Sequence, residues 1–354
     1  MNNLKRKITA FLLGIMALLT MSACSINSEK RYEARFLELF DTASIIVGYA
    51  GNEEEFGRYS QMAYDELEIY NNLFDIYSDY EGVNNIKTIN DNAGIAPVEV
   101  DKKIIELLLF SKDMYDLTEG KVNVAFGSVL SLWHDHRSDG LDNPERATIP
   151  DFEELKERNQ YVDIDDMIID TEASTVYLKD PNMRLDVGAI AKGYAVEQVA
   201  LFMEEAGFVD GMISVGGNVR TLGSKHDENG NKVPWSVGIQ NPDLSSEEKN
   251  LYILNLSESS LVTSGVYERY YVVDGKPYHH IIDPVTLMPA EYFASVSIIC
   301  RDSGEADALS TAAFNMGYEE GSKLIEELDG VEALWVYADG TMEYSSGFQE
   351  LVKK

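Results

Sequence analysis

The sequence predicts an α+β fold: one compact, two-lobed domain with a mixed or antiparallel sheet and flanking helices. The chain has 354 residues, enough for one large domain or two closely packed lobes. Segments whose apolar residues recur at helical spacing alternate with short strand-like runs, and no internal repeat or low-complexity tract occurs. Short strands interspersed with helices favour the α+β class.

The first part of the chain predicts one strand and two amphipathic helices. TASIIVGY (42–49) has the composition of a strand. Helical spacing of apolar residues appears in EEEFGRYSQMAYDELEIYNNLF (53–74) and in DKKIIELLLFSKDMYDL (101–117), which ends near Gly120. HRSDGLDNPERATIPD (136–151) is rich in turn residues and predicts a surface loop.

The middle of the chain predicts two strands followed by a helix. EASTVYL (172–178) and MRLDV (183–187) flank the turn KDPN and have strand composition. The chain then enters a helix at 191–206 through small residues, and Gly207 is a natural stop for this helix.

The last part of the chain predicts several short strands and one late helix. The strand-like runs are GMISV (211–215), WSVGI (235–239), YILNL (252–256), YYVV (270–273) and YHHII (278–282). HDENGN (226–231) predicts a hairpin tip, and residues 306–328 predict a single helix. ALWVYA (333–338) and TMEYSS (341–346) predict a closing hairpin.

The N-terminus has the features of a bacterial lipoprotein leader. Lys5, Arg6 and Lys7 precede the run ITAFLLGIMALLTM, which is too short for a comfortable membrane span. MSAC, ending at Cys24, resembles a lipobox with Met21 where leucine is commoner.

The leader predicts three segments of the chain. We expect residues 1–23 to form a signal peptide, residues 24–35 to be a lipidated Cys24 with a polar tether, and residues 36–354 to be the functional domain. A multi-chain lipid anchor would hold the protein to the outer side of the bacterial cell membrane. The alternative is an ordinary cleavage site that happens to contain a cysteine.

The charge and the cysteine content exclude two classes of protein. With 61 acids against 29 bases, the formal net charge is -32, which disfavours a nucleic-acid partner. Apart from Cys24 the chain has only Cys300, so the mature chain cannot form an intramolecular disulfide. Cys300 lies in an apolar run and is expected to be a buried small hydrophobe.

Two residues of the late helix could bind a metal. Asp307 and Thr311 are four positions apart, so their oxygens fall on one helix face, one turn apart. A carboxylate, a hydroxyl and a carbonyl suit a hard cation such as Mg²⁺. In the alternative reading, Asp307 is an ordinary first-turn acid and Thr311 bonds back to the helix backbone.

The histidines offer a candidate general base. If GKPYHHIIDP continues as a strand, His279 and His280 point to opposite faces and cannot chelate one metal together. One of them could act as a base near neutral pH, and a packed or surface imidazole is the expectation for His279. His134 and His136 in WHDHR suggest zinc only weakly, because no third ligand is evident.

A glycine-rich segment follows a predicted strand. SVGGNVRTLG (214–223) would let the backbone approach a ligand closely, and the alternative is a bend at a sheet edge. Neither the dinucleotide fingerprint G-x-G-x-x-G nor a P-loop is present.

Several motifs in order resemble the ApbE family, whose members are FAD:protein FMN transferases. The resemblance covers residues 36–347. In chain order the motifs are FDTAS, NNLFDIYSDY, LTEGKVNVAFGSVLSLW, DVGAIAKGYAVE, SVGGN, TSGVYERYYVVDGKPYHHIIDPVTLMP and EADALSTAAFNMG. The resemblance implies a T-fold-type domain that binds FAD as its substrate and uses Mg²⁺ or another divalent cation.

The resemblance also implies roles for particular residues. Asp186 and Lys192 would contact FAD, and the carbonyl group of Ala189 would join Asp307 and Thr311 at the metal. His280 would be the catalytic base, Asp283 would shape its turn, and Ile281 would offer a backbone contact to FAD. Phe40, Tyr77, Lys121, Val122 and Asn123 would line the flavin and nucleotide pocket.

The implied reaction transfers FMN from FAD to a threonine hydroxyl of an acceptor flavoprotein of extracytoplasmic electron transfer, releasing AMP. The alternatives are a FAD pyrophosphatase of the same family, a catalytically idle flavin carrier and a solute-binding lipoprotein for another ligand. Two departures from the family pattern support the alternative of an idle flavin carrier. VNVA carries Asn123 where the family has Asp, and DPVTL carries Val285 and Leu287 in place of Arg and Gly.

Overall fold

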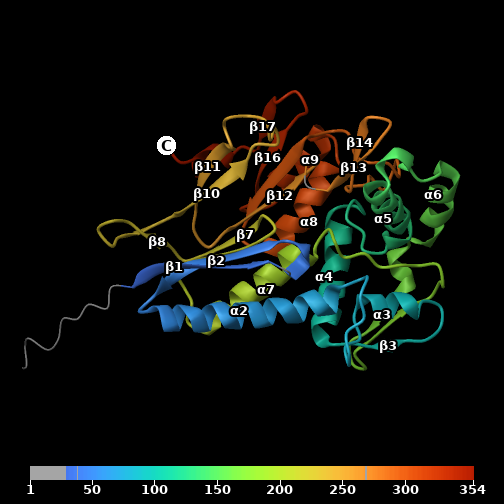
Figure 1. Cartoon of the computed structure of the whole chain (residues 1–354), viewed down its shortest axis with the longest axis horizontal. Coiled ribbons are helices and arrows are strands. Elements are labelled where there is room, and N and C mark those ends of the chain that lie inside the picture. Colours follow the sequence, from blue (N-terminus) through green and yellow to red (C-terminus); the bar gives the residue numbers. More distant parts are fainter. Residues whose placement is uncertain (1–28, 38, 268) are drawn as a thin grey trace, which may run out of the picture.

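An eight-stranded antiparallel sheet forms the centre of the fold in the computed structural model, which describes residues 29–37, 39–267 and 269–354 (Figure 1). The predicted signal peptide and Cys24 lie outside these residues. The strands, in their order across the sheet, are β1 (Lys30–Leu37), β2 (Ala43–Ala50), β6 (Gly211–Val215), β7 (Asn218–Leu222), β12 (Ser260–Gly265), β15 (Ser295–Cys300), β16 (Glu332–Val336) and β17 (Met342–Tyr344).

Helices cover one face of this sheet, and a two-stranded ribbon covers the other. The helices are α2 (Glu53–Phe74), α7 (Ala191–Glu205) and α8 (Ser303–Phe314), and the ribbon pairs β10 (Trp235–Gln240) with β11 (Asn250–Leu256). Because neighbouring strand residues point to opposite faces, Ile46 packs in the helical cluster while Val47 packs with the ribbon. Both faces of β2 are therefore buried.

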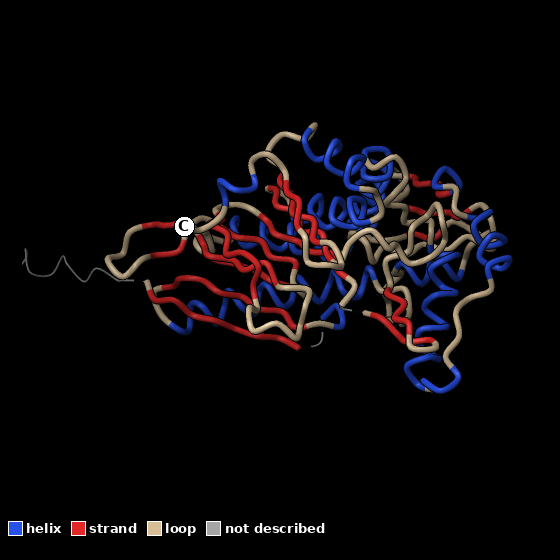
Figure 2. The backbone as a smooth tube through the Cα atoms, turned by 90° about the horizontal axis from the view of Figure 1, so that it is seen from above, coloured by secondary structure: helices blue, strands red, loops and turns tan. Residues whose placement is uncertain are grey.

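A second lobe of helices and small sheets lies at the other end of the molecule (Figure 2). Its elements are α3 (Ile86–Asp91), α4 (Lys102–Leu117), α5 (Gly127–Asp142), α6 (Phe152–Arg158), β3 (Val98–Glu99), β4 (Met167–Asp170), β5 (Thr175–Leu178), β13 (Tyr270–Val273) and β14 (Lys276–His279). One hydrophobic cluster joins Ile104 and Leu107 of α4 to Leu67 of α2 and Val199 of α7. This shared core makes the two lobes one domain.

The remaining elements are short or lie at the edges. They are the 3-10 helices Leu39–Asp41, Pro144–Arg146, Asn159–Tyr161 and Ile164–Asp166, the helices α9 (Tyr318–Glu326) and α10 (Phe348–Leu351), and the hairpin of β8 (Lys225–His226) and β9 (Lys232–Val233).

A buried ion pair fixes the two central helices to the sheet. Glu197 of α7 accepts hydrogen bonds at Oε2 from Arg220 Nε of β7 and from the backbone amide of Ser303 at the start of α8, both 2.9 Å long. Burial raises the pKa of Glu197, and the Arg220 charge opposes that shift. The pair therefore holds α7 and α8 in register above the sheet.

The predicted α+β class and antiparallel sheet are confirmed, as are the helices at 53–74, 102–117 and 191–205. The hairpin tip at 226–231 and the closing hairpin are present as well. Cys300 is buried in β15, as expected.

Four predicted elements were wrong, and one of them, the strand at 278–282, is described with the site. Residues 136–142 belong to helix α5 and not to a loop. Gly140 is needed inside this helix because it lies against the Tyr271 ring, where a Cβ would be 2.6 Å from Cδ2. Residues 183–187 form only an isolated bridge at Arg184. The late helix is two helices, because α8 ends at the cap Asn315 and α9 starts from Gly317.

The structure differs from the predicted tether over residues 30–35. These residues belong to β1, which pairs with β2 along its whole length, and Tyr32 stacks on Phe56 with ring centroids 5.4 Å apart. The folded domain thus begins at Lys30 among the residues described. No helix in the described part of the chain is long and apolar enough to cross a bilayer.

Candidate active site

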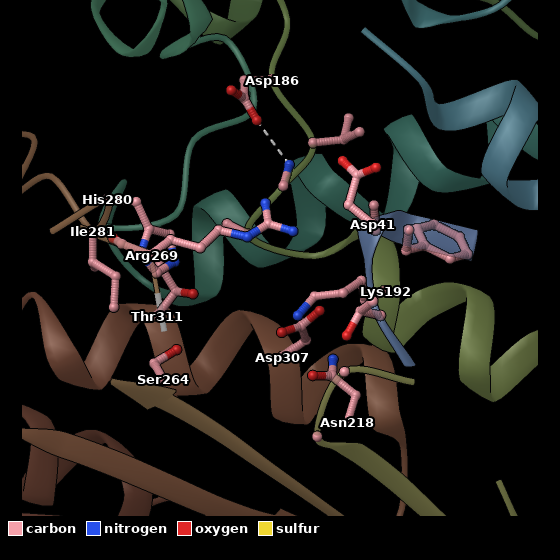
Figure 3. Close-up of a pocket in the computed structure, with 18 of the residues that line it drawn as sticks. Asp41, Asp186, Lys192, Asn218, Ser264, Arg269, His280, Ile281, Asp307 and Thr311 are labelled. Atoms are coloured by element: carbon pink, nitrogen blue, oxygen red, sulfur yellow. Dashed lines mark hydrogen bonds between the residues drawn. The ribbon is translucent and has the colours of Figure 1, made fainter. Parts of the chain in front are cut away.

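A cavity of about 940 Å³ lies between the main sheet and the second lobe (Figure 3). It collects residues that are far apart in the sequence and were predicted to bind FAD or metal. The predicted residues that line it are Phe40, Tyr77, Lys121, Val122, Asn123, Asp186, Ala189, Lys192, His280, Ile281, Asp307 and Thr311. Asp283 is buried below the surface of the cavity and does not line it.

Asp186 is held by a backbone hydrogen bond, and one side chain fixes the residue before it. The neighbouring Leu185 exchanges two hydrogen bonds with the Asn90 amide, 2.7 and 2.9 Å long, and the Asp186 amide donates to Val124 O. Oδ1 of Asp186 accepts from the Gly188 amide at 2.8 Å, which is the dashed line in Figure 3. Oδ2 lies 3.7 Å from His134 Nε2. The carboxylate therefore shapes the turn that leads into α7.

The small residues at the start of α7 allow it to pack closely on α8. A Cβ at Gly193 would collide with the carbonyl oxygen of Ser303 and with Cβ of Asp307. The Gly193 amide also donates a hydrogen bond to Asp307 Oδ2 at 2.7 Å. The glycine is therefore required by the contact between two helices, a reason that the sequence pattern alone did not reveal.

Asp307 is a buried carboxylate whose charge is only partly balanced. Burial raises its pKa, while the Lys192 charge and the Gly193 amide act in the opposite direction. Figure 3 shows Lys192 reaching toward Asp307. Thr311, one turn further along α8, also lines the cavity, and it is Ser310 that bonds back to the helix carbonyl of Asp307. A buried acid and a hydroxyl on one helix face fit a hard cation.

His280 has one ring nitrogen engaged and the other available. Its backbone amide and its Nδ1 both bond to the carbonyl oxygen of Arg269, at 3.1 and 3.2 Å. Because a carbonyl only accepts, Nδ1 carries the proton and Nε2 has the lone pair. The ring is accessible to water within the cavity, but the surrounding protein and the Arg269 charge lower the pKa of His280. The imidazole is therefore neutral at neutral pH, as a general base must be.

His279 is a packed imidazole, as expected. Its Nε2 bonds to Ala290 O at 2.8 Å, its Nδ1 accepts from the Ile281 amide, and its ring meets Phe314 edge-on with centroids 5.7 Å apart. The strand ends at His279, so the expected continuation through 280–282 is wrong. The bond at Arg269 orients His280 instead.

Asp283 organises the turn that follows His280. Its Oδ1 accepts from the Val285 amide at 2.8 Å, and its carbonyl oxygen accepts from the Leu287 amide. Leu287 has a positive φ of 62°, the conformation that favours glycine, yet its side chain is buried and its carbonyl oxygen accepts from Trp133 Nε1. Burial of the Leu287 side chain therefore offsets the strain at a position where the ApbE pattern has glycine. Val285, which stands where the pattern has arginine, is exposed and does not line the cavity.

Asn123, which stands where the ApbE pattern has Asp, is also accommodated by the structure. Asn123 accepts from the Ala125 amide at Oδ1, 2.8 Å away, and donates from Nδ2 to Val162 O at 2.9 Å. A carboxylate could make the first of these bonds but not the second. The Lys121 ammonium donates to Asn315 O and so links this segment to the end of α8.

The cavity contains residues that sequence reasoning missed. Arg137 of α5 and Arg269, which precedes β13, both line it. His134, weighed only as a zinc ligand, also lines the cavity, and its Nδ1 lies 2.9 Å from the Tyr77 hydroxyl. Arg137 lies in the segment predicted as a surface loop, so nothing in the sequence indicated it. Arg269 stands within one of the ordered motifs, which is the signal that could have identified it.

A possible metal-binding group lies away from the cavity. In the described part of the chain, Glu29, Asp210 and His226 are the only three acidic or histidine groups close enough together to hold an ion. The Asp210 carboxylate is already paired with Lys232 at 2.7 Å. His134 and His136 do not belong to this group, and His136 bonds to Thr148.

The turn at Gly216 and Gly217 fits both readings of the glycine-rich segment. Both glycines have positive φ, 54° and 89°, and they form the tight turn of the β6–β7 hairpin. Both also line the cavity, so the sheet bend is at the same time a place where the backbone is open to a ligand.

Several known proteins with similar sequences are named FAD:protein FMN transferase. The chain is 35% identical over 278 residues to the FAD:protein FMN transferase of Treponema pallidum, covering 76% of this chain and 75% of that protein. It is 28% identical over 267 residues to the FAD:protein FMN transferase of Escherichia coli K12, covering 74% and 72%.

Solved structures agree with this similarity. The ApbE protein from Thermotoga maritima has a TM-score of 0.77 at 30% identity, covering 92% of this chain and 100% of that one. The flavin transferase ApbE from Vibrio cholerae has a TM-score of 0.74 at 24% identity, covering 91% and 99%, which shows a shared fold. The ApbE family model matches residues 41–335, most of the described chain, and the chain therefore belongs to the ApbE family.

Proposed function

We propose that this chain is a metal-dependent enzyme that transfers FMN from FAD to a threonine hydroxyl of an acceptor flavoprotein and releases AMP. Family membership and relatives named FAD:protein FMN transferase support the transfer. The observation that carries the proposal is that one cavity holds both a buried acid, Asp307, and a neutral imidazole, His280.

The metal would be held by Asp307, Thr311 and the carbonyl group of Ala189. A divalent cation bound there would neutralise charge on the phosphate oxygens. Lys192 supplies a fixed positive charge next to this site. The burial of Asp307, which Lys192 and the Gly193 amide balance only in part, supports the assignment, because a cation would lower the cost of keeping this carboxylate ionised.

His280 would act as the general base. Its Nε2 would take the proton of the acceptor hydroxyl as the hydroxyl oxygen forms a bond to the phosphorus of the FMN half. The bond between this phosphorus and the oxygen bridging the two phosphates breaks, and AMP leaves with that oxygen. Arg269 fixes the ring through its carbonyl oxygen, so Nε2 stays the accepting nitrogen.

No observation favours a catalytically idle carrier. Of the three substitutions that supported it, Asn123 is satisfied by hydrogen bonds and Leu287 by packing, while Val285 is exposed and does not line the cavity. Hydrolysis of FAD differs from transfer only in the acceptor oxygen. Incubating the protein with FAD and Mg²⁺ and separating the products tests the proposal. AMP should accumulate with a candidate acceptor present, and intact FAD under all conditions would refute it.

We further propose that the chain works outside the cytoplasm, anchored by lipid on Cys24. The basic leader, its short apolar run and the MSAC sequence support this location. A Cys24→Ser variant should leave the membrane fraction with its fold intact. If it stays with the membrane after a high-salt wash, the anchor lies elsewhere.

A further inference from the structure

Two arginines from different parts of the chain meet in the cavity. Arg137 comes from α5, one turn after His134, and Arg269 lies just before β13. Figure 3 shows the Arg269 guanidinium group projecting into the open space of the cavity between Asp186 and Lys192. Both guanidinium groups lie close enough to Tyr77 to act on its hydroxyl group.

These two cations differ in burial, since Arg137 is partly buried and Arg269 is exposed. Nε of Arg137 is buried and has no hydrogen-bond partner. Neither guanidinium group forms an ion pair within 4.0 Å with a residue that the structure describes, although the chain carries 61 acids. Burial and then the Arg269 charge lower the pKa of Arg137, so the two like charges lie close together.

An anion bound by both arginines would offset the unpartnered Arg137 donor and the repulsion between the two charges. The buried Nε of Arg137 has no hydrogen-bond partner, which costs folding free energy, and the neighbouring Arg269 charge adds repulsion. Arginine stays protonated under these conditions, so it cannot escape the cost by losing its proton. The planar, forked donors of two guanidinium groups match an anion with several oxygens, above all a phosphate group.

We propose that Arg137 and Arg269 bind the diphosphate of FAD, opposite the proposed metal site. This inference rests on the proposed function and adds the residues that recognise the charged part of the substrate. The arginines would then favour FAD over flavins that lack phosphate.

Ligand binding tests the pair separately from transfer. Arg137→Gln and Arg269→Gln should each weaken FAD binding at least about tenfold, the loss of one charge-assisted contact of about 1.5 kcal/mol or more. Riboflavin, which has no phosphate, should bind each variant within about twofold of the parent. Arg269→Lys should keep part of the FAD affinity, because it keeps the charge but not the fork.

Two further measurements guard against misfolding and against failure of the proposed reaction. Inorganic pyrophosphate, in chelator to exclude metal effects, should raise the melting temperature of the parent but not of either Gln variant. Without ligand, the Gln variants should melt no lower than the parent, because like-charge repulsion is relieved. Arg58→Gln, at an exposed position of α2, is the matched control and should change nothing.

Specific outcomes overturn the inference. Equal losses for FAD and riboflavin would make the arginines general structural residues, and unchanged FAD binding in both variants would exclude them from the site. If FAD binds as expected but no acceptor is ever modified, the diphosphate site stands while the proposed transfer fails.

Discussion

The backbone amide of Gly193 donates a 2.7 Å hydrogen bond to Oδ2 of Asp307, which joins the first turn of α7 to α8 at the cavity. The bond requires that residue 193 have no side chain, because a Cβ would collide with Ser303 and with Asp307 itself. The packing of two helices and the placement of the proposed metal ligand are therefore one structural feature.

Replacing this glycine should damage both the fold and the site. Gly193→Ala forces α7 and α8 apart, so we expect a loss of about 1–3 kcal/mol in the free energy of unfolding and weaker metal binding. The control is Gly57→Ala in α2, where no atom lies within 4 Å of the added Cβ. There the better helix propensity of alanine should stabilise by about 0.5–1 kcal/mol. Urea denaturation of both variants measures this, and equal effects would contradict the close packing.

Removing the charge of Asp307 should stabilise the protein and weaken its metal binding. Its raised pKa means that ionisation above the unfolded pKa costs folding free energy, so Asp307→Asn should raise the melting temperature without metal at pH 7. Calorimetry should show Mg²⁺ affinity lowered by at least about tenfold more than in Thr311→Val, because a charged ligand is lost. An Asp307→Asn variant that binds Mg²⁺ like the parent refutes this site.

The lowered pKa of His280 sets the direction of its pH effects. The neutral, base-competent imidazole persists below the ordinary histidine pKa of about 6.5, so the acid limb of transfer should lie below that pH. Because the unfolded chain binds the proton more readily, the parent should lose stability relative to His280→Asn as pH falls below about 6.5. An acid limb centred at or above this value would contradict the assignment.

The His280→Asn variant separates chemistry from binding. Transfer should fall at least about a hundredfold, the lower bound for losing a general base, while FAD affinity changes only a few-fold. His136 lies on α5 like His134 but outside the cavity, so His136→Asn should leave both the transfer rate and the FAD affinity nearly unchanged. A collapse of FAD affinity would show that His280 is a binding group.

Leu287 should be more important for stability than the glycine it replaces. Leu287→Gly relieves a left-handed conformation worth about 1–2 kcal/mol but empties a buried site, for which leucine truncations cost about 2–5 kcal/mol. We therefore expect a net loss of about 1–3 kcal/mol, measured in urea, with FAD affinity unchanged. A variant more stable than the parent would show that the strain dominates.

Much of the fold follows from periodicity, and the exceptions have tertiary causes. The apolar spacing in residues 53–74 is sufficient to define α2, since its buried face repeats regularly. Gly140 looked like a turn residue because nothing local reveals the Tyr271 ring that requires it. Residues 183–187 have strand composition, yet Asn90 supplies the partners that a neighbouring strand would otherwise provide.

The site was predictable where its residues stand in contiguous motifs. Asp186, Lys192 and Ala189 share one short segment, and the helical spacing of Asp307 and Thr311 is visible in the sequence. Arg137 and Arg269 are more than a hundred residues apart and become a pair only when α5 packs against the β13–β14 hairpin. No local pattern links them.

The most direct test of the central claim is the intact mass of a candidate acceptor protein after incubation with this enzyme, FAD and Mg²⁺. We predict a mass increase equal to one covalently bound FMN on a threonine, with one AMP released for each adduct and neither formed in chelator. An acceptor of unchanged mass together with free FMN and AMP would identify a hydrolase, and unchanged FAD would contradict catalysis altogether.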